Sequence, residues 1–375
     1  MTKVSDFLAQ LDLSADEIAL KAHLPTERIR AILSGADVSL ADLRAIARGL
    51  KIPIRTFAGD PSTTSDLALL FRSTVPQRSD LGVEQAAAFV NAALSIMPAR
   101  SRPPDWLAGF AYERETYQEA ERLAQSFRLI FTTERQDDPL LDLPQILVQL
   151  GGIILGRLET SRFEGASVIA DGYAFIFVSP RFVGRMLFTL AHELGHLIAH
   201  HRERRAVVFD RATQIGGHRY RDTAEAFVDA FASVLLMPAR GVALALKQIR
   251  ETLNVKNPAI GDIELLYLSR FFGVSFEVAA RRCEQLELLP PGGTRTFLDH
   301  MKQFGGAEKR AEALDLPKRP IVSIPRVSAN LLKAAADLCD QGKISIGWIT
   351  DQLGCSVNDI YVARVPSEAS RGLHH

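Results

Sequence analysis

The chain has 375 residues, of which 47% are hydrophobic and 23% charged, and its 44 basic residues balance 44 acidic ones. This composition is typical of a globular protein with two or three domains. The net charge of zero excludes a surface that is basic throughout, so any contact with nucleic acid must be local. The three scattered cysteines exclude a disulfide framework and a cysteine zinc site. With no leader segment or membrane span predicted, we expect a cytoplasmic protein.

Residues 1–57 carry the signals of several short helices. Ser14 followed by Glu17 forms a capping box, and Pro25 with Thr26 opens a further helix. Several short helices with tight turns in under 60 residues are typical of a helix-turn-helix module.

The stretch LSADEIALKAHLPTERIRAILSG, residues 13–35, resembles the xenobiotic-response-element (XRE) type of helix-turn-helix. The resemblance implies a DNA-binding module, acting as a homodimer, whose second helix enters the major groove. That helix would present four side chains to the bases: Thr26, Glu27, Arg28 and Arg30.

Two positions depart from the XRE pattern, because Ala15 and Pro25 stand where Gln and Ser are common. Residues 1–57 also hold eight basic against seven acidic residues, which leaves little net charge for phosphate binding. A dimerisation or docking module made of four helices is therefore the alternative function of this segment.

The remaining chain divides into three parts. Residues 58–108 contain stretches rich in Pro, Ser and Asp around one probable helix, which predicts a helical connector. From residue 109 long helical patterns mix with short β-like runs, which predicts an α+β domain over 109–290. After the turn LLPPGGT, residues 295–375 predict a mainly helical region, whose role the sequence does not decide.

The stretch MLFTLAHELGHLIAHH, residues 186–201, holds four of the nine histidines on a mostly apolar helix. His192 and His196 are four residues apart, so both imidazoles lie on one face and can bind one metal ion. Glu193 completes the His-Glu-x-x-His pattern of zinc hydrolases, in which the carboxylate takes a proton from the activated water. Gly195 predicts a close approach by another segment. We expect His200 and His201 to form an ordinary helix end, where positive charge suits the helix dipole.

A catalytic zinc ion takes three protein ligands and keeps one position open. The following segment DTAEAFVDAFASVLLMP offers three carboxylates, Asp222, Glu225 and Asp229. Glu225 and Asp229 share a helix face, and spacing alone does not choose between them.

FTLAHELGHLIAHH, followed about thirty residues later by EAFVDAFASVLLMP, resembles the ImmA/IrrE family of metallopeptidases, which is related to the gluzincins. DLPQILVQLGGIILGRL, GYAFIFVSP and YLSRFFGVSFEVAARRCEQLELL are similar to the family's flanking segments, so the resemblance covers about 115–288. It implies that Glu225 is the third ligand of a zinc or manganese ion and that Asp229 supports a ligand from outside. It also implies that YAFIFVS lies beside the cleft, where an extended substrate adds as a strand.

The loop GGHRYRD, between the two ligand helices, supplies His218 and Tyr220 as candidates to stabilise the developing oxyanion, although either residue would equally suit a surface loop.

The expected fold is a mostly helical α+β chain, with an all-α amino-terminal module, a zincin-like peptidase domain around a small sheet, and a helical carboxy-terminal region. The expected function is a metal-dependent endopeptidase that binds DNA and cleaves an XRE-type repressor in response to stress, DNA damage or mobile-element induction. The alternative is a transcriptional regulator that senses metal or a ligand and cuts nothing. Glu193 favours the enzyme, because a sensor needs no base there.

Overall fold

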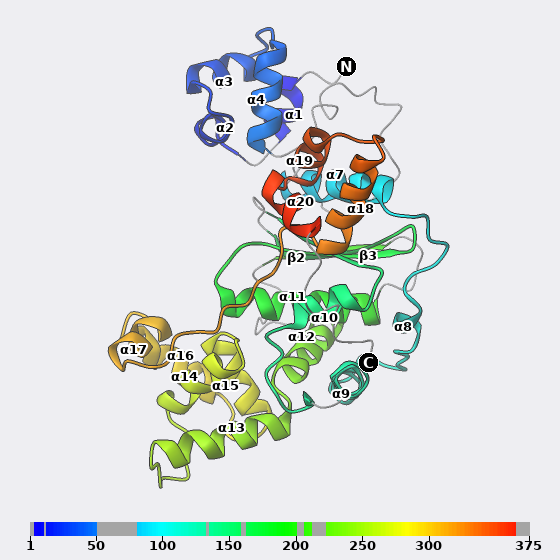
Figure 1. The fold of residues 1–375 in the computed structure, drawn as a ribbon. Coiled ribbons are helices and arrows are strands. Elements are labelled where there is room, and N and C mark those ends of the chain that lie inside the picture. Colours follow the sequence, from blue (N-terminus) through cyan, green and yellow to red (C-terminus); the bar gives the residue numbers. More distant parts are fainter. Residues whose placement is uncertain are drawn as a thin grey trace.

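The computed structural model describes residues 4–10, 13–50, 81–132, 135–158, 163–200, 206–211 and 223–364. Within these residues the fold is mostly helical, with one small four-stranded sheet in the central region (Figure 1). The predicted α+β class is therefore confirmed. No single helix in the described part of the chain is long and apolar enough to cross a membrane, although the bent pair Thr223–Leu236 and Ala239–Thr252 passes a test of length and composition.

The amino-terminal segment forms a small helical unit at one end of the molecule (Figure 1). Its helices are α1 (Val4–Gln10), α2 (Ala15–Ala22), α3 (Thr26–Leu33) and α4 (Leu40–Leu50). The predicted capping box is present, since Ser14 Oγ accepts from the Glu17 amide at 3.2 Å and the Ser14 amide donates to Glu17 Oε2 at 2.7 Å. His23 adopts a left-handed φ of 52°, which ends α2 and gives the tight turn into α3.

The sheet contains β1 (Ile153–Arg157), β2 (Phe163–Ala170), β3 (Tyr173–Val178) and β4 (Ala206–Arg211), in the order β1-β3-β2-β4. Asp171 and Gly172, both with positive φ, connect β2 to β3 as a two-residue hairpin turn. β1 pairs parallel to β3, and β4 pairs antiparallel to β2.

This strand order corrects the prediction that YAFIFVS offers an edge to a substrate. That segment is β3, and it pairs with β1 on one side and with β2 on the other. Its backbone groups are already engaged in the two ladders, so no further strand can add to it. The sequence could not show this, because β1, nearly twenty residues upstream, takes the edge that a local hairpin would have left open.

Helices cover one face of the sheet as a thick layer (Figure 1). Next to the strands lie α10 (Leu143–Gln149) and α11 (Val183–Ala199), and α12 (Thr223–Leu236) packs between α11 and α9 (Tyr117–Phe131). The remaining helices at this end are α8 (Asp105–Ala108), α13 (Ala239–Thr252), α14 (Asp262–Phe271), α15 (Phe276–Gln285), α16 (Gly293–Lys302) and α17 (Ala307–Ala313). From β3, Ala174, Ile176 and Val178 point into this core.

The opposite face of the sheet has its own core. It is covered by α7 (Leu81–Ile96), α18 (Ala329–Asp340), α19 (Ile346–Leu353) and α20 (Val357–Arg364) (Figure 1). The alternate side chains of β3, including Phe175 and Phe177, are buried here with Leu331 of α18. Helices from the predicted connector and from the predicted carboxy-terminal region thus complete the packing of the central sheet.

The segment before α18 also occupies the outer edge of β1. Val327 bridges to Gly156, the Ser328 amide donates to the Leu155 carbonyl at 3.1 Å, and Asn330 Nδ2 donates to the Ile153 carbonyl at 3.1 Å. These bonds satisfy an edge that would otherwise expose unpaired backbone groups.

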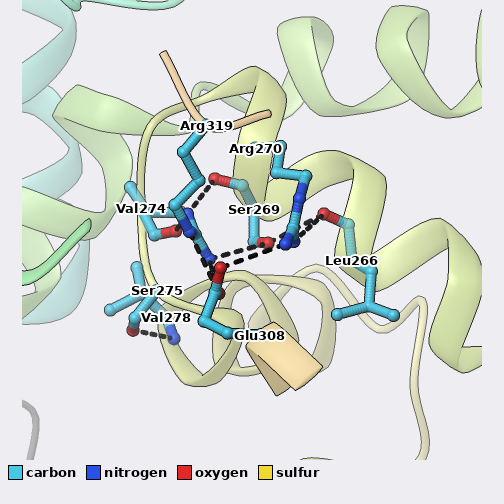
Figure 2. A network of polar contacts seen from close by, with 8 residues as sticks. All are labelled: Leu266, Ser269, Arg270, Val274, Ser275, Val278, Glu308 and Arg319. Carbon is cyan, nitrogen blue, oxygen red and sulfur yellow. Dashed lines mark hydrogen bonds and ion pairs between the residues drawn. The ribbon is translucent and has the colours of Figure 1, made fainter. Parts of the chain in front are cut away.

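Arg319 fixes the start of that segment to the helices below it, as Figure 2 shows. Its Nη1 donates to the carbonyls of Val274 at 2.6 Å and Ser269 at 3.1 Å. Its Nη2 donates to Glu308 Oε1 at 2.8 Å, and Arg270 pairs with Oε2 of the same carboxylate at 3.0 Å. The Glu308 carboxylate of α17 thus joins α14, through Arg270, to the segment before α18, through Arg319.

Candidate metal centre and active site

α11 brings the predicted histidines into the interior. Its apolar residues face both the sheet and α12, so the last two turns are buried on all sides. His192 is 0% exposed and His196 is 2% exposed. Gly195 lies against α12, where a Cβ atom would come within 3.1 Å of Val228 and Phe231. The close approach predicted from this glycine is confirmed, and it brings the two ligand-bearing helices together.

Three side chains converge on a single point between α11 and α12. The Nε2 atoms of His192 and His196 are 3.2 Å apart, and each lies 3.5 Å from one oxygen of Glu225. A tetrahedral ion with ligand bonds of about 2.0–2.1 Å separates its ligand atoms by about 3.3 Å. His192, His196 and Glu225 therefore have the separations of three ligands on one zinc ion.

Asp229 fixes the tautomer of the first histidine. Its Oδ1 lies 2.8 Å from Nδ1 of His192, on the side of the ring away from Glu225. An ionised carboxylate can only accept, so Nδ1 of His192 carries the proton and Nε2 presents its lone pair to the common point. The structure thereby separates the two carboxylates that spacing alone left equivalent: Glu225 faces the Nε2 atoms, and Asp229 supports His192 from outside.

These groups fit a divalent cation. Two imidazole nitrogens and a carboxylate converge on one buried point, where a positive charge would be stabilised by all three. Nitrogen and carboxylate oxygen are the ligands that zinc prefers, and manganese also accepts this set.

Glu193 lies next to the ligands and directly against β2. Its side chain is 0% exposed, and a Cβ atom at Gly165 would overlap its Oε1 and come within 2.7 Å of Thr189. A side chain at this point of the strand would therefore have to displace Thr189 and the Glu193 carboxylate. The sequence analysis missed Gly165, although an isolated glycine inside a β-pattern is a recognised sign of close approach.

His200 and Glu115 extend the site beyond the predicted residues. Nδ1 of His200 lies 2.8 Å from Nδ1 of His196, and its Nε2 lies 3.3 Å from Oε1 of Glu115. Burial lowers the pKa of His200, and the neighbouring His196 lowers it further. His200 thus ends α11 as predicted, but its ring lies in the site and its lowered pKa disfavours the positive charge expected there. The four-residue spacing of 192, 196 and 200 places all three imidazoles on one face, a signal that the sequence already carried.

Two buried arginines anchor the far end of α12. Arg128 Nε donates to the Leu235 carbonyl at 2.7 Å, and Arg282 Nε donates to the Met237 carbonyl at 2.8 Å. Positive charge at the carboxy-terminal end of a helix is favourable, and both bonds satisfy carbonyls without helical partners. They fix the axial position of the helix that carries Glu225.

Three of the residues considered in the sequence analysis lie outside the described residues. They are Asp222 and the oxyanion candidates His218 and Tyr220, all in 212–222. His201 is outside as well.

The structure places the predicted DNA-contact residues on α3 in different surroundings. Thr26 begins the helix, and Glu27 and Arg30 are exposed. Arg28 instead pairs with Asp42 at 2.6 Å and donates to the Asp37 carbonyl at 2.8 Å, which ties α3 to the start of α4. The contact of these residues with DNA stays a prediction.

Residues 155–284 match the model of the IrrE N-terminal-like domain, the M78 family of peptidases. The match spans the sheet, α11 and α12, and so includes every residue of the convergent donor set. The central part of this chain thus contains an IrrE-like metallopeptidase domain with a candidate His-His-Glu metal site. No curated protein matches the chain.

Proposed function

We propose that the central domain is a zinc-dependent endopeptidase, with manganese as the second candidate metal. The observation that carries this proposal is the convergence of His192, His196 and Glu225 at ligand separations, with the buried Glu193 next to His192 in the sequence and against Gly165 of β2. When bound, the ion supplies Lewis-acid activation of a scissile carbonyl and of the attacking water. The two histidines and Glu225 would be enough to bind a metal ion. The additional buried carboxylate of Glu193 supplies a base, which hydrolysis needs.

In this proposal Glu193 performs the proton transfers. Its carboxylate accepts a proton from the attacking water and delivers it to the nitrogen of the leaving amine. Gly165 leaves room for this carboxylate against β2, and in this proposal that contact positions the base before substrate binds. Asp229 and Glu225 have no free role in these transfers, since each faces an imidazole nitrogen.

An extended substrate needs a strand edge, and the sheet leaves few. β3 is central, and residues 327–330 occupy the outer edge of β1. No described residue pairs with the outer edge of β4, which joins the sheet through β2 and so lies on the side of Glu193. We therefore place the peptide substrate along β4.

The biological function that we propose is limited cleavage of an XRE-type repressor in the cytoplasm, in response to stress, DNA damage or mobile-element induction. It is supported by the combination, in one chain, of an IrrE-like peptidase domain with an amino-terminal pair of helices joined by a tight turn. Limited cleavage needs a single cut in a linker and no processive machinery.

The test is to co-express the chain with the XRE-type repressor encoded beside it, as wild type and as Glu193→Gln. We expect a cleaved repressor with the wild type and an intact one with Glu193→Gln, while both proteins retain metal. No cleavage by the wild type under any inducing stress would overturn the endopeptidase proposal and leave a metal-binding regulator.

We also propose that the amino-terminal unit binds DNA as a homodimer through α3. The groove-facing side chains would be Thr26 and Arg30. Among the described residues, Arg30 has only an exposed contact of 3.4 Å with Asp16, whereas Arg28 is held by Asp42 at 2.6 Å. Promoter binding should fall at least tenfold in Arg30→Glu, with Arg48→Glu on the exposed side of α4 as the control of equal charge change. If Arg30→Glu and Arg48→Glu bind the promoter with the same affinity, α3 does not lie in the groove. A docking module is then the favoured function.

A further inference from the structure

We infer that His200 and Glu115 are positioning residues that hold His196 in the only tautomer able to bind the metal. The inference rests on the metal centre proposed above and extends it to residues that no ligand pattern includes. Glu115 lies outside the segment that matches the IrrE-like domain.

Two imidazole nitrogens, one from His196 and one from His200, are in contact. Nδ1 of His196 and Nδ1 of His200 are 2.8 Å apart, so one of them must donate a proton and the other must accept it. If His196 donates, its Nε2 keeps a lone pair and can bind the ion. If His200 donates, the neutral His196 carries its proton on Nε2, and that nitrogen cannot be a ligand.

Glu115 decides between these two arrangements. Its Oε1 lies 3.3 Å from Nε2 of His200, and a carboxylate beside that nitrogen favours a proton on it. A neutral His200 with its proton on Nε2 has only a lone pair left on Nδ1. It must then accept from His196, which places the lone pair of His196 toward the metal. The tautomer preference thus passes from Glu115 through His200 to the ligand.

Glu115 is itself fixed by its other oxygen. Thr223, the first residue of α12, donates to Glu115 Oε2 at 2.7 Å. The same short segment adds Tyr112, whose hydroxyl donates to the Ala199 carbonyl at 3.2 Å and whose ring stacks on Phe227 at 4.9 Å. Residues 112–115 therefore link the end of α11 to the start of α12 and keep the carboxylate beside His200.

The two histidine ligands are then supported in parallel ways. His192 has a carboxylate directly on its outer nitrogen, whereas His196 has an imidazole there with a carboxylate behind it. Such outer partners of a metal-bound histidine fix its orientation, and their removal lowers metal affinity about 10-fold to 100-fold.

The experiment measures zinc affinity of the full chain by competition with a chromophoric chelator. His200→Leu removes the acceptor, and we expect zinc affinity to fall about 10-fold to 100-fold. His200→Asn retains an acceptor, because its Oδ1 occupies the place of Nδ1, so its affinity should stay near the wild-type value. Glu115→Ala should weaken binding, while Glu113→Ala, an exposed residue in the same segment, should not. Thermal unfolding of the metal-free proteins shows whether each variant is folded.

Equal affinity of wild type and His200→Leu would overturn the inference. So would a His200→Asn variant as weak as His200→Leu, because packing and not the acceptor would then be responsible. These outcomes leave the metal centre intact. A wild-type chain that binds no zinc would instead overturn the proposed function, together with this inference.

Discussion

Glu225 and Asp229 lie one turn apart on α12 but meet different atoms of the site. Glu225 faces the Nε2 atoms of both histidines, whereas Asp229 meets Nδ1 of His192. The difference arises from the packing of α12 on α11, which brings the first turn of α12 nearest to the ligand nitrogens. The four-residue spacing shows that Glu225 and Asp229 share a helix face. It does not show which turn of α12 lies nearest to the histidines of α11.

At the same scale, Asp42 illustrates a charge used for stability. Hydrogen bonds from Arg28 and from Ser39 hold the pKa of Asp42 at about 2, below its usual value of 3.8. A lowered folded-state pKa stabilises the fold above pH ~4 and loses that contribution as the pH falls toward about 2.

We therefore expect Asp42→Asn to destabilise the amino-terminal unit at pH 7 by about 1 kcal/mol, a modest value because Arg28 is 35% exposed. The measurement is hydrogen exchange of the α3 and α4 amides in both proteins. The difference in stability between the two proteins should shrink as the pH falls from about 4 toward about 2, because the pKa of Asp42 is about 2 in the fold and usually 3.8. A difference that is the same at pH 7 and at the acid end of this range would mean that the ion pair is not its cause.

At the scale of elements, the contact of β2 with α11 determines where Glu193, the proposed base, lies. Gly165 leaves no space for a side chain beside Glu193. We expect Gly165→Ala to displace the carboxylate and reduce repressor cleavage about 100-fold while zinc binding is retained.

Gly347→Ala is the control for this substitution, since a Cβ atom there meets nothing closer than 4.0 Å. Its cleavage rate should match the wild type. Full activity in Gly165→Ala would show that the base does not need the position that the structure gives it.

The elements also show how far local sequence signals reach. The capping box at Ser14, the histidine helix and the strand at 173–178 follow from residues close together in the chain, and they were predicted. The position of β3 between two strands and the contact of Glu115 with His200 depend on segments distant in the chain. Periodicity shows which face of one element is buried but not which distant segment packs against that face. These features could therefore not be predicted from it.

At the scale of the whole molecule, the sheet joins two hydrophobic cores. α7 from the predicted connector and α18–α20 from the carboxy-terminal region bury one face, and α11 buries the other. β3 contributes to both cores through alternate side chains, so we expect damage to one core to be transmitted through the strands to the other.

We expect Leu331→Ala, at a fully buried position of α18, to lower the free energy of unfolding by about 2–5 kcal/mol. Ile321→Ala, at a position 93% exposed, should change it by less than about 0.5 kcal/mol. Urea unfolding is followed by the fluorescence of Trp106 and Trp348, which pack against the first and second core respectively.

If the sheet couples the cores, Leu331→Ala shifts the transitions seen by both tryptophans. A shift confined to Trp348 would show instead that residues 329–364 unfold as an independent appendage.

We propose above all that α11 and α12 together hold one metal ion in a peptidase site. Native mass spectrometry of the purified chain in the presence of zinc tests it most directly. We predict one zinc ion on the wild type and on Glu193→Gln, and none on Glu225→Ala at the same zinc concentration. Full zinc occupancy in Glu225→Ala would contradict the ligand set and move the third position to Asp229, and a wild type without zinc would contradict the metal centre altogether.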